Sequence, residues 1–66
     1  MGKKSFGDSV KAFRKKHRIT QMELAAKLKT TQPHLSRIEA NLGLPSMQLA
    51  QKIAAVAKKY GVELSL

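Results

Sequence analysis

Apolar residues recur three to four positions apart along most of this chain, a spacing typical of helices that bury one face. A serine or threonine that can cap a helix stands just before each apolar stretch. Together, the spacing and the capping residues predict helices over residues 5–17, 20–28, 31–40 and 46–60. We therefore expect a compact all-α domain of four to five helices.

Local signals sharpen two of these helix ends. Thr20 and Glu23 have the spacing of a capping box, in which each side chain accepts a hydrogen bond from the backbone amide of the other. Asn41 follows the third helix, and asparagine tolerates the left-handed conformation at which many helices end. The side chains expected to be buried in the second helix are Leu24, Leu28 and either Met22 or Ala25.

The tail at residues 61–66 changes period. Val62, Leu64 and Leu66 alternate with polar residues, which is a pattern typical of a β-strand. A single strand cannot satisfy its own backbone, so a strand here would need a partner from the N-terminal part of the chain or from a second copy. A short C-terminal strand is therefore the one β element that the sequence allows.

Length and chemistry exclude several classes of protein. Sixty-six residues make one domain, close to the lower limit for a chain that folds unaided. There is no cysteine for a disulfide or a zinc site, and His17 and His34 have no acidic cluster at metal-ligand spacing, so we expect both beside solvent or phosphate. With four acids and no nucleotide or nucleophile motif, we expect no enzyme, metal or cofactor.

The charge favours a polyanionic partner. Thirteen lysines and arginines against four acids give a formal charge of +9, although a surface charged for solubility is the alternative. An interfacial membrane helix would carry aromatic residues and leucine opposite its lysines, whereas the apolar residues of the first helix are better explained as core. No apolar run has the length of a signal peptide or of a bilayer span, about 20 residues, so the default compartment is the cytoplasm.

Residues 21–39 form the most informative unit. A helix of two turns, a break at residues 29–31 and a second short helix make the geometry of a helix-turn-helix. Ala25 lies where the two helices would cross, and a larger side chain would separate them. The second helix then turns outward a set of side chains that can enter a major groove, namely Thr31, Gln32, Pro33, Ser36 and Arg37.

The run TQMELAAKLKTTQPHLSRIE resembles the helix-turn-helix of the phage repressor and Cro family, also called the XRE-type family. The likeness extends from Phe6 to about Leu64 and includes a preceding helix and the loop with Pro45-Ser46. The resemblance implies a lambda-repressor-like fold over residues 1–66, with the motif at about 20–40. It also implies a bacterial or phage-encoded protein that binds double-stranded DNA and regulates transcription.

The resemblance further implies which side chains contact bases. Gln32 falls where the family places a base-reading glutamine, which can pair with N6 and N7 of adenine. Arg37 is suited to O6 and N7 of guanine, whereas Pro33 can make only apolar contact, for example with a thymine methyl group. The expected base-contacting residues are Gln32, Pro33, Ser36 and Arg37.

Other residues should brace the motif or contact the DNA backbone. Gln21 resembles the glutamine that braces the backbone and the recognition residues. Lys29 stands where the family usually has glycine, and a left-handed backbone there would cost roughly 1 kcal/mol. The residues implied to contact the DNA backbone are Gln21, Thr31, Lys29, His34, Asn41, Lys15, Lys16 and Arg18, with solvent as the alternative surroundings of His34.

Arg14 and Glu39 have the spacing of a structural ion pair found in this family, which joins the first helix to the end of the recognition helix. The alternative role for Arg14 is direct contact with phosphate. We favour the ion pair, because Glu39 would otherwise add negative charge beside DNA.

The first functional hypothesis is a homodimeric repressor on a palindromic operator, with recognition helices about 34 Å apart. The expected interface residues are Leu42, Leu44, Val62, Leu64 and Leu66, with the core as the alternative for Leu42 and Leu44. The second is an antitoxin that binds a toxin protein and represses its own promoter, since family members with a tail like residues 61–64 often serve this way. RNA binding is a weaker third hypothesis, because no exposed aromatic platform is expected.

Overall fold

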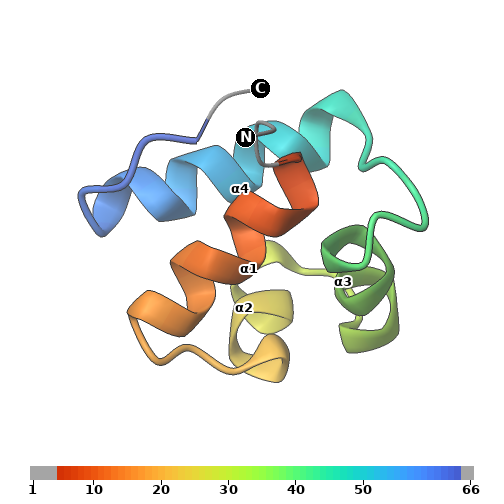
Figure 1. The fold of residues 1–66 in the computed structure, drawn as a ribbon, viewed down its shortest axis with the longest axis horizontal. Helices are drawn as coiled ribbons and strands as arrows, with labels where there is room; N and C mark the ends of the chain where they lie inside the picture. The colour runs from red at the N-terminus through yellow and green to blue at the C-terminus, as the bar shows by residue number, and fades with distance from the viewer. Residues whose placement is uncertain (1–4, 65–66) are drawn as a thin grey trace.

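The computed structural model describes residues 5–64, which form four helices joined by short turns (Figure 1). The helices are α1 (Phe6–Lys16), α2 (Gln21–Leu28), α3 (Gln32–Glu39) and α4 (Met47–Lys59). Each helix lies within the range that the apolar spacing predicted. The expected all-α fold is therefore confirmed, with four helices in the part of the chain that the structure describes.

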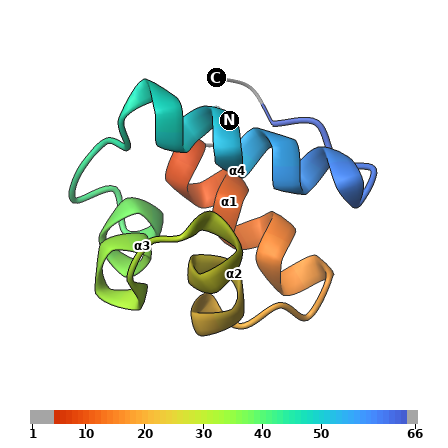
Figure 2. The same cartoon turned by 180° about the vertical axis from the view of Figure 1, so that it is seen from behind.

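The helices pack around a single aliphatic core. α4 runs along one side of the molecule, α2 and α3 lie at the opposite side, and α1 crosses between them (Figures 1 and 2). α2 packs against both α3 and α4, and α1 packs against α3. The buried core residues are Val10, Phe13, Ile19, Leu24, Ala25, Leu28, Leu35, Ile53 and Ala57. Of the two alternatives in α2, Ala25 is buried and Met22 is exposed, so α2 and α3 can approach closely.

Each helix begins after a hydroxyl side chain that accepts a hydrogen bond from the amide three residues later. The capping residues are Ser5, Thr20, Thr31 and Ser46. The capping box of α2 is complete, since the Glu23 amide donates to Thr20 Oγ1 at 3.0 Å and the Thr20 amide donates to Glu23 Oε1 at 2.8 Å. The hydrogen bond from the Thr20 backbone, followed by that to its side chain, lowers the pKa of Glu23, so this cap weakens only when acid protonates the carboxylate.

Among residues 5–64, three non-glycine residues adopt the left-handed conformation, each at the end of a helix or in the turn after one. Asn41 has φ of 61° just after α3, as the sequence predicted. Lys29 has φ of 57° at the end of α2, a position at which the sequence left the left-handed conformation open. Arg18, with φ of 55° in the turn after α1, was not predicted to be left-handed. Lys29 lies in the short turn between α2 and α3, and its left-handed backbone lets the chain reverse there within a few residues.

Replacing Lys29 with glycine should raise the free energy of unfolding by about 0.5–1 kcal/mol. Glycine adopts a left-handed backbone without the steric cost of a side chain, and its larger loss of conformational freedom offsets only part of that gain. The matched control is Lys27→Gly, which removes the same charge inside α2 and should lower stability by about 1 kcal/mol. Urea unfolding of both variants checks the prediction, and a loss of stability in Lys29→Gly would contradict it.

The C-terminal tail does not form a strand within the described residues. Gly61 turns the chain with φ of 78°, and the Val62 amide donates to the Ala57 carbonyl at 3.0 Å. The turn directs the tail back along α4 (Figure 1). Val62 and Leu64 are half-buried and pack against the molecule's own core. The alternation that suggested a strand therefore reflects packing on a helical core, and Leu66 lies outside the described residues.

Candidate nucleic-acid interface

α3 divides cleanly into a buried face and an exposed face. Leu35 and Ile38 are almost completely buried beneath it. The side chains expected to contact bases lie on the other side, where Gln32, Pro33 and Arg37 are exposed and Ser36 is half-buried. The amphipathic spacing of this short helix therefore holds a polar row outward, in a position from which it can meet a ligand.

A chain of hydrogen bonds ties Gln32 to the framework. Its Nε2 atom donates to Oε1 of Gln21, the first residue of α2, at 3.0 Å. Nε2 of Gln21 donates in turn to Oε1 of Glu39 at 3.2 Å. Glu39 is only 4% exposed and accepts two hydrogen bonds from Arg14, one from Nε to Oε2 at 2.8 Å and one from Nη2 to Oε1 at 2.9 Å. Three helices thus contribute to one connected network.

The chemistry of this network sets the orientation of Gln32. An ionised carboxylate can only accept hydrogen bonds, so Glu39 requires Gln21 to present its NH₂ group. The carbonyl oxygen of Gln21 must then face Gln32, which is obliged to donate with its own NH₂ group. The carbonyl oxygen of Gln32 and its second N–H group remain available to a ligand.

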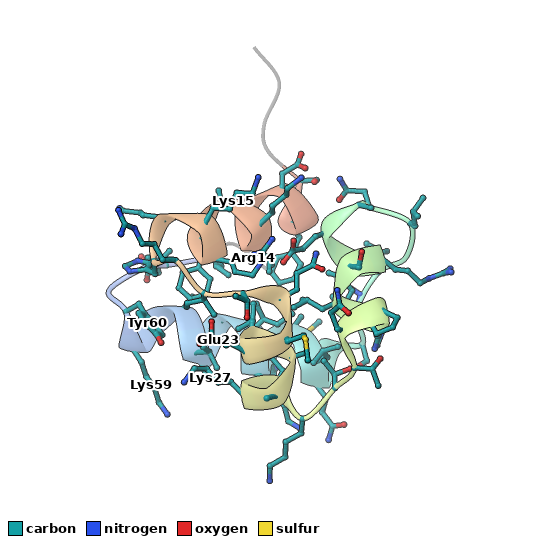
Figure 3. The ribbon with its side chains drawn as sticks, turned by 90° about the horizontal axis from the view of Figure 1, so that it is seen from below. Arg14, Lys15, Glu23, Lys27, Lys59 and Tyr60 are labelled. Atoms are coloured by element: carbon teal, nitrogen blue, oxygen red, sulfur yellow. The ribbon has the colours of Figure 1, made fainter. Side chains whose placement is uncertain are left out.

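The ion pair between Arg14 and Glu39 is present in the structure. It engages two of the three guanidinium nitrogens of Arg14, Nε and Nη2. A third donor of Arg14, Nη1, binds the carbonyl oxygen of Ile19 at 3.0 Å. Figure 3 shows Arg14 pointing from α1 toward the interior, between α1 and α2. The hydrogen bond with Glu39 raises the pKa of Arg14 despite the opposing effect of burial. The geometry therefore supports the structural role of Arg14 over direct contact with phosphate.

Comparison with known families identifies this arrangement of helices and side chains. A helix-turn-helix family model of the XRE and Cro type matches residues 10–65. The chain belongs to this helix-turn-helix family. Its members bind DNA and are typically not enzymes. No curated protein and no solved structure matches the chain significantly.

Within this helix-turn-helix domain, the cations proposed for phosphate contact lie at two turns. Lys15, Lys16 and Arg18 are exposed at the end of α1, close in the chain to the start of α2. Lys29 is exposed in the turn between the two motif helices.

No helix among residues 5–64 combines the length and the apolar character needed to cross a bilayer.

Three polar residues expected at the DNA backbone make contacts within the protein. Thr31 caps α3, because the His34 amide donates to its hydroxyl at 3.3 Å. The exposed His34 ring lies with Nδ1 at 3.0 Å from the Thr30 hydroxyl. The Asn41 side chain accepts from the Ser5 hydroxyl at 2.7 Å and donates to an Asp8 carboxylate oxygen at 3.3 Å. Asn41 therefore links the end of α3 to the start of α1.

The prediction that His17 lies beside solvent or phosphate is wrong. The ring is half-buried between Phe13 and Tyr60, with ring centroids at 5.5 Å and 5.0 Å. Its Nε2 atom is buried and has no hydrogen-bond partner among the described residues. The spacing of residues along the chain could not predict this cluster, because Tyr60 lies at the C-terminal end of α4, far from His17 in the sequence.

Large apolar side chains are exposed in the loop after α3 and at the start of α4. Leu42 is 68% exposed and Leu44 is 92% exposed, so the core alternative for these two residues is wrong in the single chain. Met47, at the start of α4, is 68% exposed and was not singled out from the sequence. Its exposure became visible only once the rotation of α4 was known.

Proposed function

We propose that this chain is a sequence-specific regulator of transcription, a repressor that binds a palindromic operator as a homodimer. The observation that carries the proposal is the exposed polar face of α3, on which Gln32 is held in one orientation by Gln21. Rigid presentation of a side chain favours specific contacts, because less conformational freedom is lost on binding.

The free groups of Gln32 match adenine. The base presents an acceptor at N7 and a donor at N6 in the major groove. The second N–H of Gln32 suits N7, and its carbonyl oxygen suits the N6 amino group, while the first N–H stays on Gln21. The hydrogen bond from Gln32 to Gln21 thus favours adenine as the base that Gln32 contacts.

The other exposed side chains of α3 complete the proposed contact surface. Arg37 lies farther along the helix and is suited to the two acceptors of guanine, O6 and N7. Pro33 can meet a thymine methyl group, and Ser36 can donate to a base or a phosphate. Lys15, with the remaining exposed cations, would supply contacts to phosphate that do not depend on sequence.

Selection of bound duplexes from a random pool tests the proposal. We expect an enriched palindrome whose half-sites contain an adenine and, a few base pairs away, a guanine. Half-site centres should lie about 34 Å apart, one turn of DNA, because two-fold pairing of the protein matches two-fold symmetry of the site. Recovery of unselected sequences would overturn the proposal.

Replacing Arg37 with alanine should weaken specific binding by about 1–3 kcal/mol and relax the preference at one base position. The control is Lys15→Ala, which also removes one exposed cation but should weaken binding to all sequences alike and reduce the salt dependence by about one unit of slope. Affinities for the selected duplex and its single-base variants, measured at several salt concentrations, separate the two effects. An unchanged base preference in Arg37→Ala would contradict the assignment.

The antitoxin alternative has less support. It depends on the tail as a surface for a toxin protein, yet Val62 and Leu64 are half-buried against the chain's own core. Binding to a toxin through these side chains would require the tail to detach from that core.

A further inference from the structure

A cavity of about 260 Å³ lies between the end of α2 and the middle of α4, two helices that pack against each other (Figure 2). Half of the residues that line it are apolar and half are cationic. We call this surface the basic cleft and define it by its lining residues, Lys27, Leu28, Lys29, Lys52, Ala55 and Val56. Segments far apart in the chain thus bring three lysines together around apolar side chains.

The positive charge of the basic cleft is not balanced within the protein. Its three lysines are exposed, and none of them forms an ion pair with another of the residues 5–64. Glu23 lies one turn before Lys27, but its carboxylate accepts the hydrogen bond from the Thr20 amide that completes the capping box. Because three like charges around one cavity repel one another, a ligand that brings negative charge would be attracted there.

The DNA contacts proposed above do not account for the basic cleft. Lys29 is the only lining residue that belongs to those contacts, and α4 supplies none of them. The phosphate groups of a duplex could neutralise the lysines, but they would leave the apolar side chains of the cleft without a partner. The lining therefore suits a ligand that is both anionic and apolar.

The size of the basic cleft fits one side chain of a peptide. Small-molecule sites usually enclose about 300–1,000 Å³, so the cleft is smaller than a typical site of that kind. Leu28 is buried, Val56 is half-buried and Ala55 is exposed, so a large apolar side chain in the cleft would contact carbon atoms. Carboxylates on the neighbouring residues of such a peptide would then lie near the exposed lysines.

We propose that the basic cleft binds an acidic segment of another protein, which places one large apolar side chain in the cleft and its carboxylates beside Lys27, Lys29 and Lys52. A side chain that fills a pocket often supplies most of the affinity of a protein–protein contact, whereas exposed ion pairs add little individually. The apolar side chain therefore provides the affinity, and the lysines select an acidic segment over a basic one. This partner surface goes beyond the proposed function, since no residue of α3 lines it.

The probe for this surface is a short, fluorescently labelled peptide of aspartate and glutamate with one central leucine. Its control is the same peptide with serine in place of the leucine, so the two peptides carry equal charge. In anisotropy titrations with the full chain at physiological salt, which weakens attraction by net charge alone, we expect the leucine peptide to bind about ten-fold or more tightly than the serine peptide.

Charge-reversing variants locate the bound peptide. Lys52→Glu reverses a charge in the basic cleft, whereas Lys11→Glu reverses another exposed charge on α1, outside the cleft. We expect the dissociation constant of the leucine peptide to rise about ten-fold or more for Lys52→Glu and less than about two-fold for Lys11→Glu. Lys27→Glu, on the other helix of the cleft, should repeat the effect of Lys52→Glu, which guards against a folding defect in one variant.

Two results would show that net charge alone attracts the peptide and would overturn the proposal. They are equal binding of the leucine and serine peptides, and equal weakening by Lys52→Glu and Lys11→Glu. A labelled duplex of random sequence tests the other polyanion, and Lys52→Glu should affect its binding no more than Lys11→Glu does. If Lys52→Glu weakened binding of the duplex and not of the peptide, the cleft would belong to the DNA interface, and the proposal would again be overturned.

Discussion

Replacing Arg14 with methionine should lower the free energy of unfolding by about 3–5 kcal/mol, because it leaves a buried carboxylate without its charged partner. Glu39 is 4% exposed, and Arg14 supplies two of the three side-chain hydrogen bonds that it accepts. The variant would also lose the bond from Arg14 to the Ile19 carbonyl. A domain of this size has a total stability of about 3–5 kcal/mol, so the variant should be largely unfolded at room temperature.

Two further variants isolate the cause of that loss. Lys15→Met removes an exposed cation from the neighbouring position and should change stability by no more than about 0.5 kcal/mol. Combining Arg14→Met with Glu39→Met should recover much of the lost stability, because two apolar side chains can replace a buried ion pair with little net cost. Circular dichroism at room temperature gives the folded fraction of Arg14→Met, and urea unfolding measures the other two variants. Equal effects of Arg14→Met and Lys15→Met would contradict the role given to this ion pair.

Features that depend on residues close together in the chain were predictable from sequence. Thr20 and Glu23 are three positions apart, so a capping box could be predicted before the fold was known. Asn41 follows its helix in the left-handed conformation for an equally local reason, because asparagine tolerates that conformation. Together with the apolar spacing, such signals predicted the four helices of the described region.

Features that depend on distant residues were predicted less well. His17 was expected beside solvent or phosphate, because nothing near it in the chain indicated the contact with Tyr60. The tail alternates like a strand, but the turn at Gly61 folds Val62 onto the core. Alternation with a period of two residues indicates which side chains are buried, but it does not indicate whether a sheet or a helix buries them.

One part of the candidate site was predicted from the resemblance to a known family, and another part was not predicted. The bracing role of Gln21 and the pair between Arg14 and Glu39 both came from the likeness to the repressor and Cro family. The hydrogen bond from Gln21 to Glu39, which merges these two features into one network, could not be predicted because it requires the packing of three helices. That bond determines which way the amide of Gln32 points.

Gly7 has a structural role that no sequence pattern predicted. It is buried in the first turn of α1, where α1 and the end of α3 pack against each other. A Cβ atom built there would overlap the carbonyl oxygen of Ile38 and lie 2.6 Å from Oδ1 of Asn41. The overlapped atom belongs to the backbone, so a rotamer change cannot relieve the contact, and the two helices would have to move apart.

Replacing Gly7 with alanine should therefore lower the free energy of unfolding by about 3 kcal/mol, at the upper end of the usual range for overpacking. The higher helix propensity of alanine offsets this loss by only about 1 kcal/mol at most. Gly43→Ala is the matched control, because a Cβ there meets nothing within 4 Å and its effect should be neutral or slightly stabilising. Thermal and urea unfolding of the two variants give the comparison. If Gly7→Ala were as stable as Gly43→Ala, the start of α1 could not lie as close to α3 as this fold requires.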